Sequence, residues 1–248
     1  MPRSLNDATP IVHDVTVSSE SVLEREMYTD VAAAELLRVH ITTLRRWLEG
    51  AVRQGTVYDP ILRPERTGSR NMTWGEFVEA DFLRQYRKIH EVSLGDLRAF
   101  IRELREETGV RYPLAHARPW VGPGKKLLIR AQRETNLEPE LWTAFEPKSG
   151  QIMLTAPAES FLGRVTFDQK GGNGIVSVLH PAGKDSAVVI DPNLRFGAPC
   201  IKGISTSTLI DAVTVGESVE SLASDYDLTV AEVAEAISFE ATAARLAA

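Results

Sequence analysis

Several features that mark enzymes, secreted proteins or membrane proteins are scarce in this sequence of 248 residues. The single cysteine, Cys200, excludes an intramolecular disulfide and a cysteine-based zinc cluster. The five histidines lie far apart and show no metal-ligand spacing, so we expect no catalytic residue, metal or cofactor. The sequence contains no stretch of about eighteen uncharged apolar residues, which a membrane-spanning helix needs. Its N-terminus also lacks the apolar segment after basic residues that marks a signal peptide. We therefore expect a cytoplasmic protein without a signal peptide or a membrane span.

Charge is divided unevenly along the chain, although the net charge at pH 7 is only −6. Residues 28–133 carry 19 Lys and Arg against 13 Asp and Glu, whereas residues 134–248 carry 7 against 16. Within residues 206–248, one basic residue stands against eight acidic ones. The basic N-terminal half is expected to attract a polyanion. The acidic residues 206–248 are repelled by nucleic acid and suit a basic protein surface instead.

Two short helices joined by a tight turn are predicted near the start of the basic half. Thr29 is expected to cap the first helix, and Thr42 or Thr43 the second. The second helix has apolar residues at helical spacing, which define its buried face: Leu44, Trp47 and Leu48. A basic hairpin is expected next, with a strand over 57–62, a turn-rich loop over 63–70 and a return strand at 71–72.

Capping boxes mark the starts of three later helices, because a Thr or Ser is followed three residues on by an acid. These pairs are Thr73 with Glu76, Ser93 with Asp96 and Thr229 with Glu232. Gly109 is expected to end the helix that Ser93 begins. Two more helices are expected over 206–213 and after Ser218, and the buried stripe of the last helix is predicted as Val230, Val233, Ala234 and Ile237.

The central region is predicted to be a small antiparallel sheet that follows a Pro/Gly linker over 119–124. Its β-rich runs are 126–131, 141–145, 151–155, 162–167, 175–179 and 187–190. Residues 171–174 are expected to form a hairpin turn, because they lack the Lys-Ser/Thr of a phosphate loop. The chain is thus expected to be an α+β protein, divided into an N-terminal arm (1–27), a DNA-binding domain (28–115), a β-rich middle region (116–189) and a C-terminal helical module (190–248).

Arginine dominates the segment around the two-helix unit, which favours nucleic acid as a partner. Every basic residue of 38–70 is an arginine, whose planar fork binds a phosphate or a guanine edge in a bidentate manner. The second helix fits a DNA major groove, with hydroxyl and free backbone N–H groups at its start placed for phosphate. The residues expected to contact DNA are Thr42, Thr43, Arg45, Arg46, Arg53, Arg63, Arg66 and Arg70. A small helical hairpin with a solvated charged face is the alternative interpretation.

Residues 28–47 and the loop over 63–70 resemble the MerR-like winged helix-turn-helix of bacterial regulators. The shared features are Tyr-Thr before an Ala-rich helix and Thr-Leu-Arg-Arg-Trp over 43–47 in the recognition helix. The similarity covers about residues 27–115 and implies a DNA-binding winged helix-turn-helix. Regulators of this family continue into a long dimerising helix and an effector domain, and this chain departs from that pattern after Gly109.

The C-terminal residues are similar to a small three-helix domain of unknown function. The similarity rests on Asp191–Pro192, the run 196–206, Gly216–Glu217–Ser218 and the run 225–229. This domain is common in proposed antitoxins encoded beside PIN-domain ribonucleases. With the helix-turn-helix in front, the resemblance implies a VapB-type antitoxin, which neutralises a PIN-domain (VapC-type) toxin and represses the shared operon. It further implies a dimer on a palindromic operator.

The acidic C-terminal module is expected to contact this toxin. The residues expected there are Glu217, Glu220, Asp225, Asp227, Glu232 and Arg245. Two modes stay open: the acidic helices cover a basic RNA-binding surface, or Arg245 pairs with metal-binding carboxylates of the toxin and displaces the metal. Two other functions also stay open, namely a stand-alone MerR-like regulator with a small-molecule effector and a nucleic-acid-processing enzyme or accessory subunit.

Overall fold

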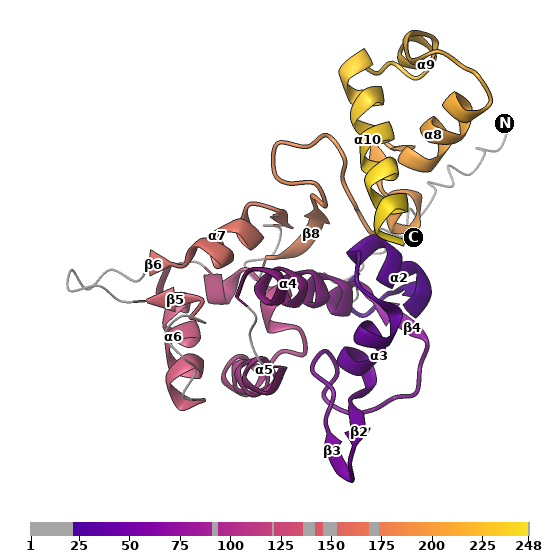
Figure 1. The fold of residues 1–248 in the computed structure, drawn as a ribbon. Helices are drawn as coiled ribbons and strands as arrows, with labels where there is room; N and C mark the ends of the chain where they lie inside the picture. Colours follow the sequence, from indigo (N-terminus) through magenta and orange to yellow (C-terminus); the bar gives the residue numbers. More distant parts are fainter. Residues whose placement is uncertain are drawn as a thin grey trace, which may run out of the picture.

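The computed structural model describes residues 22–90, 94–120, 122–135, 142–145, 153–168 and 174–247. In this part of the chain, helices combine with five two-stranded antiparallel sheets, which makes an α+β fold (Figure 1). The helices are α2 (Asp30–Leu37), α3 (Ile41–Glu49), α4 (Trp74–His90), α5 (Leu94–Thr108), α6 (Lys125–Glu134), α7 (Ala156–Leu162), α8 (Thr206–Thr214), α9 (Val219–Asp225) and α10 (Val230–Ala247). The strands are β1 (Glu26–Thr29), β2 (Ala51–Arg53), β3 (Thr56–Tyr58), β4 (Asn71–Thr73), β5 (Ala144–Phe145), β6 (Met153–Leu154), β7 (Val165–Asp168), β8 (Ile175–Leu179), β9 (Cys200–Ile201) and β10 (Ile204–Ser205).

Hydrogen bonds from side chains define where α2 and α3 begin. Thr29 caps α2 as predicted, because its Oγ1 accepts from the N–H of Ala32 at 3.2 Å. The cap of α3 is His40, whose Nδ1 accepts from the N–H of Thr42 at 3.3 Å. The prediction of Thr42 or Thr43 as the cap is therefore wrong, since both lie inside the helix. An unprotonated imidazole nitrogen supplies the acceptor that a hydroxyl supplies at many helix starts.

The hairpin after α3 is built from different residues than the sequence predicts. β2 pairs with β3, so that Ala51 lies opposite Tyr58. Gln54 and Gly55 form the turn, and both have a positive φ, of 49° and 79°. Two successive residues with positive φ are typical of the turns whose twist matches that of paired strands. The predicted strand over 57–62 therefore ends at Tyr58, and its partner precedes it in the chain.

Residues 59–70 return to the core as a loop below α3. The N–H groups of Ile61 and Leu62 both donate to the carbonyl of Trp47, at 2.8 and 3.0 Å, and both side chains are buried. β4 then pairs with β1, with Thr29 opposite Asn71. The predicted pairing of 71–72 with 57–62 is wrong for this reason. The end of the expected N-terminal arm is thus a strand, while residues 1–21 lie outside the described part of the chain.

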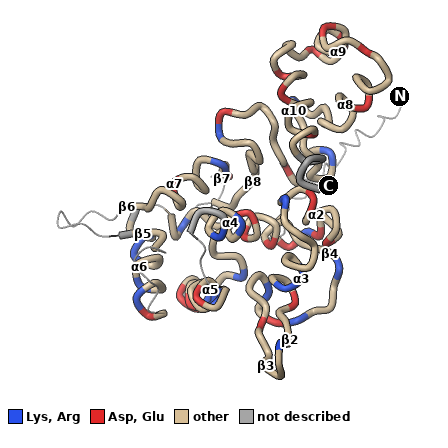
Figure 2. The backbone as a smooth tube through the Cα atoms, in the orientation of Figure 1, with Lys and Arg blue, Asp and Glu red and all other residues tan. Residues whose placement is uncertain are grey.

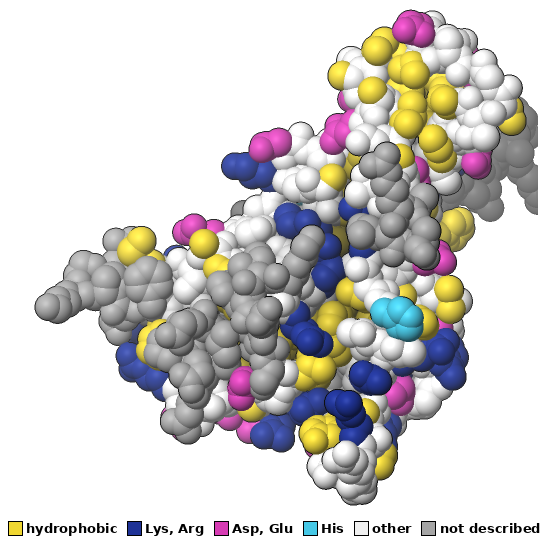
Figure 3. Space-filling model, viewed as in Figure 1, with side chains coloured by type: hydrophobic (Ala, Val, Ile, Leu, Met, Phe, Trp, Pro, Cys, Tyr) yellow, Lys and Arg dark blue, Asp and Glu magenta, His cyan; other side chains and the backbone are white. Residues whose placement is uncertain are grey.

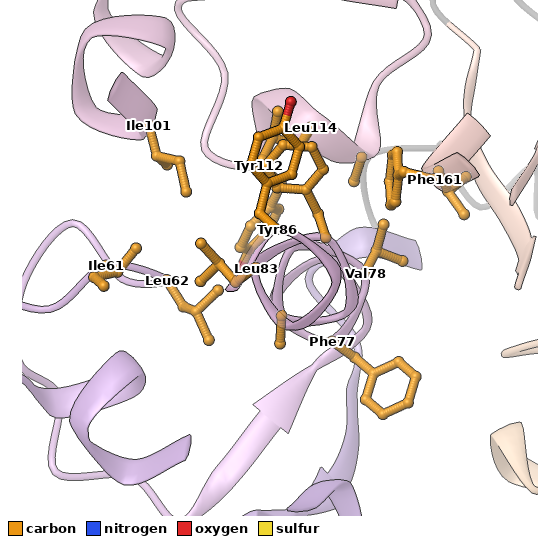
Figure 4. Close-up of a cluster of buried hydrophobic side chains, with 14 of the residues drawn as sticks. Ile61, Leu62, Phe77, Val78, Leu83, Tyr86, Ile101, Tyr112, Leu114 and Phe161 are labelled. Carbon is orange, nitrogen blue, oxygen red and sulfur yellow. The ribbon is translucent and has the colours of Figure 1, made fainter. Parts of the chain in front are cut away.

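α4 is the central helix and is buried on nearly all sides. The predicted capping box is confirmed, because Thr73 N donates to Glu76 Oε2 at 3.0 Å and Glu76 N donates to Thr73 Oγ1 at 3.2 Å. Figure 4 looks along this helix, and its apolar side chains leave it in several directions to meet other segments. The labelled members of this core are Ile61, Leu62, Phe77, Val78, Leu83, Tyr86, Ile101, Tyr112, Leu114 and Phe161. The same core cluster extends along the sequence from position 23 to position 190.

The central region contains more helix than the sequence predicts. The expected strand over 126–131 is wrong, because these residues belong to α6, which buries Leu128, Ile129 and Ala131. The expected linker over 119–124 contains two 3-10 turns, of which the first places Trp120 in the core with 1% exposure, whereas Pro123 in the second is exposed. The run 162–167 is divided between the end of α7 and the start of β7. Short apolar runs of strands and of buried helices look alike in a sequence, and tertiary packing decides between them.

Other predictions for this region are confirmed. β8 covers the expected run 175–179 and pairs antiparallel with β7. β5 and β6 form a second pair within the runs expected there. Of the predicted hairpin turn, residues 171–173 lie outside the described residues, as does Ser93. Gly109 has the left-handed φ of 68° expected at the end of α5.

α8, α9 and α10 form a lobe with an apolar core of its own (Figure 1). The capping box at its last helix is confirmed, because Thr229 N donates to Glu232 Oε2 at 2.7 Å and Glu232 N donates to Thr229 Oγ1 at 3.1 Å. The predicted stripe of α10 is partly wrong, since Val230 and Ala234 are exposed. Among positions 230–242 of α10, the buried apolar residues are Val233, Ala236 and Phe239. No helix within the described ranges has the length and apolar character to cross a membrane.

Glu79 of α4 is a fully buried carboxyl group in the main core. It accepts hydrogen bonds from Arg105 Nη2 at 3.0 Å and from the N–H of Leu114 at 3.2 Å. Burial nevertheless raises its pKa from 4.5 to about 7, against the lowering effect of Arg105. Between these two pH values the folded protein holds a proton that the unfolded chain releases. The free energy of unfolding should therefore fall as the pH rises through this range.

Glu79→Gln should remove this pH dependence, because glutamine stays neutral at every pH. We expect the free energy of unfolding of the wild type to fall by up to about 3 kcal/mol between about pH 5 and about pH 8 relative to the variant. Urea unfolding at a series of pH values measures the difference. Glu106→Gln, an exposed change on α5, is the control and should keep the wild-type slope. A Glu79→Gln variant with that same slope would contradict the assignment.

Candidate nucleic-acid interface

A three-residue turn joins α2 to α3 and fixes their relative direction. Arg38 adopts a left-handed conformation with φ of 54°, and its N–H donates to the carbonyl of Glu35. The N–H of Val39 donates to the carbonyl of Ala34, so two of the four orphan carbonyls at the end of α2 are satisfied. The residues of α3 that face the core are at most 1% exposed, as predicted: Leu44, Trp47 and Leu48. The opposite face of α3 is thereby held toward solvent.

Asp30, the first residue of α2, holds two arginines that were predicted to contact DNA. Its Oδ2 accepts from Arg45 Nε at 2.7 Å and from Arg70 Nη1 at 3.0 Å. The Asp30 side chain is 5% exposed, whereas those of Arg45 and Arg70 are 42% and 66% exposed. The hydrogen bond from Arg45, supported by Arg70, holds the pKa of Asp30 below its usual range. A buried anion thus fixes two exposed cations side by side.

A groove of about 290 Å³ opens beside these cations, between α3 and the loop over 59–70. Three arginines line it: Arg45, Arg46 and Arg70. The other lining residues are Asp30, Leu48, Glu49, Gly50, Gly68 and Ser69. Glu49 is directed toward the loop, because its Oε2 accepts from the N–H of Gly68 at 3.0 Å. The exposed charge of the groove is mainly positive, and Figure 3 shows Lys and Arg side chains over this part of the molecule.

Thr42 and Thr43 occupy the first turn of α3, and only Thr42 is fully exposed. The Oγ1 atom of Thr42 lies 2.9 Å from His40 Nδ1, which also accepts from the N–H of Thr42. The N–H of Thr43 donates to the carbonyl of His40 at 2.8 Å. Of the N–H groups at the start of α3 that were expected to be free, those of Thr42 and Thr43 already donate to His40. What this turn offers to a phosphate is the Thr42 hydroxyl.

The β2–β3 hairpin projects from the molecule next to α3 (Figure 1). Arg53 is exposed on β2, and Arg66 donates from Nη2 to the carbonyl of Tyr58 at 3.1 Å near the base of the hairpin. Val52 and Val57 lie opposite each other and are 62% and 61% exposed. The sequence interpretation did not include this apolar pair. The Gln-Gly turn between alternating apolar residues is the signal that indicates it.

Arg63 is buried, so its predicted contact with DNA is wrong. Its side chain is 2% exposed, and its Nε donates to Glu76 Oε1 at 2.9 Å. Nη2 donates to the carbonyl of Asn71 at 2.7 Å, and Nη1 to the carbonyl of Ser69 at 3.1 Å. Nη1 also bonds to a carboxylate oxygen of Glu49. The guanidinium group therefore joins structural elements and has no face left for a ligand.

The C-terminal lobe carries all five acidic residues that were predicted to contact a toxin, and Figure 2 shows acidic positions distributed over it. Four of them are exposed: Glu217, Glu220, Asp225 and Asp227. Glu232 instead caps α10 and pairs with Lys202 Nζ at 3.1 Å, contacts that lower its pKa. The side chain of Arg245 lies outside the described residues.

Exposed apolar side chains accompany these acids, and Figure 3 shows apolar atoms at the surface of this lobe. The sequence interpretation did not include them in the site. They are Val215 (81% exposed), Tyr226 (37%) and Val230 (50%). Val215 and Tyr226 lie between helices, where no periodic pattern marks them, and Val230 was assigned to the buried stripe of α10.

Metal-ligating side chains do not converge within the described ranges, where no group of three or more His, Cys, Asp or Glu could hold an ion. Cys200 is buried, and burial raises the pKa of its thiol. The reactive thiolate form is thereby disfavoured. The groups that the described surface offers to a ligand are guanidinium, hydroxyl and carboxylate groups.

Fold and surface together define an α+β protein with a cationic groove beside a helix pair and an acidic three-helix lobe. Residues 188–239, which include α8, α9 and most of α10, match the family model described as "Protein of unknown function (DUF433)". The chain is 33% identical over 227 residues to Uncharacterized protein Rv2308 of Mycobacterium tuberculosis (strain ATCC 25618 / H37Rv), and the match covers 90% of this chain and 93% of that protein. The chain therefore belongs to the same family as Rv2308.

The fold is shared with a solved structure. The X-ray crystal structure of Rv2018 from Mycobacterium tuberculosis matches with a TM-score of 0.67 at 24% sequence identity. The match covers 86% of this chain and 98% of that chain. At this identity the likeness establishes the shared fold.

Because Arg63 has a structural role, its replacement should lower the stability of the fold, whereas replacement of an exposed arginine should not. Arg63→Ala leaves the buried carboxylate of Glu76 without its cation, so we expect the free energy of unfolding to fall by about 3–5 kcal/mol. Arg66→Ala removes an exposed side chain that makes one hydrogen bond to the backbone. It should change the free energy of unfolding by less than about 0.5 kcal/mol. Chemical denaturation of both variants measures the contrast. Equal effects would contradict the structural role.

Proposed function

We propose that this chain binds duplex DNA as a winged helix-turn-helix protein, with α3 as the recognition helix and the β2–β3 hairpin as the wing. The observation that supports it is the groove in which Arg45 and Arg70, fixed by Asp30, lie beside the exposed Arg46. In this proposal α3 enters the major groove, where arginine binds guanine edges, and the hairpin follows the backbone. Asp30 orients two cations in advance, which lowers the entropy lost on binding.

We further propose that the protein is a VapB-type antitoxin, which binds a PIN-domain toxin through its C-terminal lobe and represses their shared operon as a dimer. The exposed acids of this lobe are repelled by DNA, so a protein with a basic surface suits it better. The exposed apolar residues Val215, Tyr226 and Val230 add the buried contact area that a protein interface requires. The protein acts by binding in this proposal, and no residue is assigned a catalytic role.

Arg46→Ala and Arg45→Ala test the recognition helix. Each should weaken binding to the operator by about 1–3 kcal/mol if the side chain contacts a base edge. Arg53→Ala and Arg66→Ala should weaken binding to all duplex sequences and lower the salt slope by about one unit each. Gel-shift titrations at several salt concentrations measure both quantities.

The control for these titrations is Arg102→Ala, which removes an exposed arginine from α5. It should leave the affinity and the salt slope unchanged. Unfolding curves of the Arg46, Arg53, Arg66 and Arg102 variants should overlap with that of the wild type, because these arginines are exposed. Arg45→Ala removes one of the two cations that pair with the buried Asp30, so its unfolding curve shows separately that the variant is folded. If all four changes at the helix and hairpin behave like the control, the DNA-binding proposal is wrong.

The antitoxin proposal is tested by reversing charge on the acidic lobe of the full-length protein. Glu217→Lys combined with Glu220→Lys should weaken the complex with a co-expressed PIN-domain ribonuclease and restore its RNA cleavage, while operator affinity stays unchanged. Arg245→Ala separates the two modes of neutralisation. Loss of inhibition within an intact complex supports metal displacement, and full inhibition supports coverage of the RNA-binding surface. If the doubly reversed variant still binds and inhibits fully, this use of the acidic surface is wrong.

A further inference from the structure

A second group of arginines lies where α4 and the start of β7 come together. Arg84 Nη2 and Arg164 Nη2 both donate to Oδ1 of Asp81, at 2.9 and 3.1 Å. Because they share one oxygen, these two nitrogen atoms are no more than about 6 Å apart. Asp81 is 2% exposed, and its Oδ2 is already occupied by Gln85 Nε2 at 2.7 Å. One buried carboxylate thus serves two guanidinium groups.

Arg38 brings a third guanidinium group from the turn between α2 and α3. It donates to the carbonyl of Phe239 in α10 at 3.3 Å, and its guanidinium carbon lies 5.1 Å from the centre of that aromatic ring. Burial is the largest cause that lowers the pKa of Arg38 and the pKa of Arg164. The charge of Arg84 lowers both further, and the charge of Arg38 also acts on Arg164. The three cations are therefore close enough to repel one another. Figure 3 shows Lys and Arg side chains close together between α4 and the C-terminal lobe.

Counter-charge at this junction is incomplete among the described residues. Apart from Asp81, the carboxylate that acts on this group is Glu240, which also accepts a hydrogen bond from Thr206. Arg164 Nε is buried without a partner within the described ranges. Three guanidinium groups thus face two carboxylates, and one buried donor is unused. Arg38 and the other two side chains remain partly exposed, so an anion from solvent has access.

We propose that Arg38, Arg84 and Arg164 form a binding site for a phosphate group. The planar forks of arginine match the oxygens of a phosphate, and partial burial limits screening by salt. The phosphate neutralises the excess positive charge that Asp81 and Glu240 leave. It comes either from the backbone of a bound nucleic acid or from a phosphorylated small molecule. This site is separate from the groove beside α3 and does not depend on the proposed use of that groove.

The position of Arg38 gives this site a structural consequence. Arg38 contacts the C-terminal helix α10 directly, whereas Arg84 and Arg164 belong to the main core. A phosphate held by all three therefore links the C-terminal lobe to the core next to the turn between α2 and α3. A bound phosphate should make the two parts unfold together.

Isothermal titration calorimetry of the full-length protein with inorganic phosphate, at constant ionic strength, tests the site. We expect saturable binding to one site, weakened about tenfold or more by Arg84→Gln and by Arg38→Gln, which each remove one charged fork. Arg102→Gln removes an exposed arginine from α5 and should bind phosphate like the wild type. Thermal unfolding of each variant shows whether it is folded, and Arg38→Gln provides the test if Arg84→Gln is not.

Two results would overturn the proposal. One is the absence of saturable phosphate binding by the wild type, and the other is equal weakening by Arg84→Gln and Arg102→Gln. The source of the phosphate follows from duplex DNA binding by the same variants. A backbone phosphate predicts weaker duplex binding by Arg84→Gln and a salt slope lower by about one unit, while a small molecule predicts unchanged duplex binding. Arg46→Ala should leave phosphate binding intact, so this site and the groove are tested separately.

Discussion

The guanidinium group of Arg63 joins the two elements that form the candidate groove, α3 and the loop over 59–70, to α4. It bonds to Glu49 at the end of α3, to Glu76 in the first turn of α4 and to carbonyl groups of the loop that ends at Asn71. Breaking such a buried network leaves a charge without water or partner, which costs several kcal/mol. The exposed ion pairs of the groove are worth about 1 kcal/mol or less each. The shape of the groove therefore depends on the buried Arg63. The exposed arginines of the groove add positive charge to its surface but do not determine its shape.

Asp30 connects this buried network to the surface. Its N–H donates to the carbonyl of Arg70 at 2.7 Å, so the pairing of β1 with β4 brings Arg70 to the start of α2. The carboxylate of Asp30 then holds the side chains of Arg70 and Arg45. These surface pairs contribute little stability, but they select one orientation of two long side chains. The register of β1 against β4, the start of α2 and the positions of the Arg45 and Arg70 side chains thus meet at Asp30.

Features that depend on a few neighbouring residues were predictable from the sequence. The capping boxes at Thr73 and Thr229 and the buried face of α3 are local patterns, and the structure confirms them. The role of Arg63 was not predictable, because seven arginines between 38 and 70 look equivalent until the fold brings Glu49 and Glu76 to one of them. The pairing of β1 with β4 was not predictable either, because it joins residues that lie more than forty positions apart and only the fold brings them together.

The C-terminal lobe is attached to the main core through contacts that leave little room for change. Tyr28 in β1 donates from its hydroxyl to the carbonyl of Gly197 at 2.8 Å, in a buried position. Gly197 has a φ of 74°, and a Cβ atom there would lie 2.4 Å from that hydroxyl, so a larger residue cannot replace it without displacing Tyr28. Tyr28 directly precedes the cap of α2. The buried contact between Tyr28 and Gly197 therefore joins the segment that leads into the C-terminal lobe to the strand that leads into the helix pair.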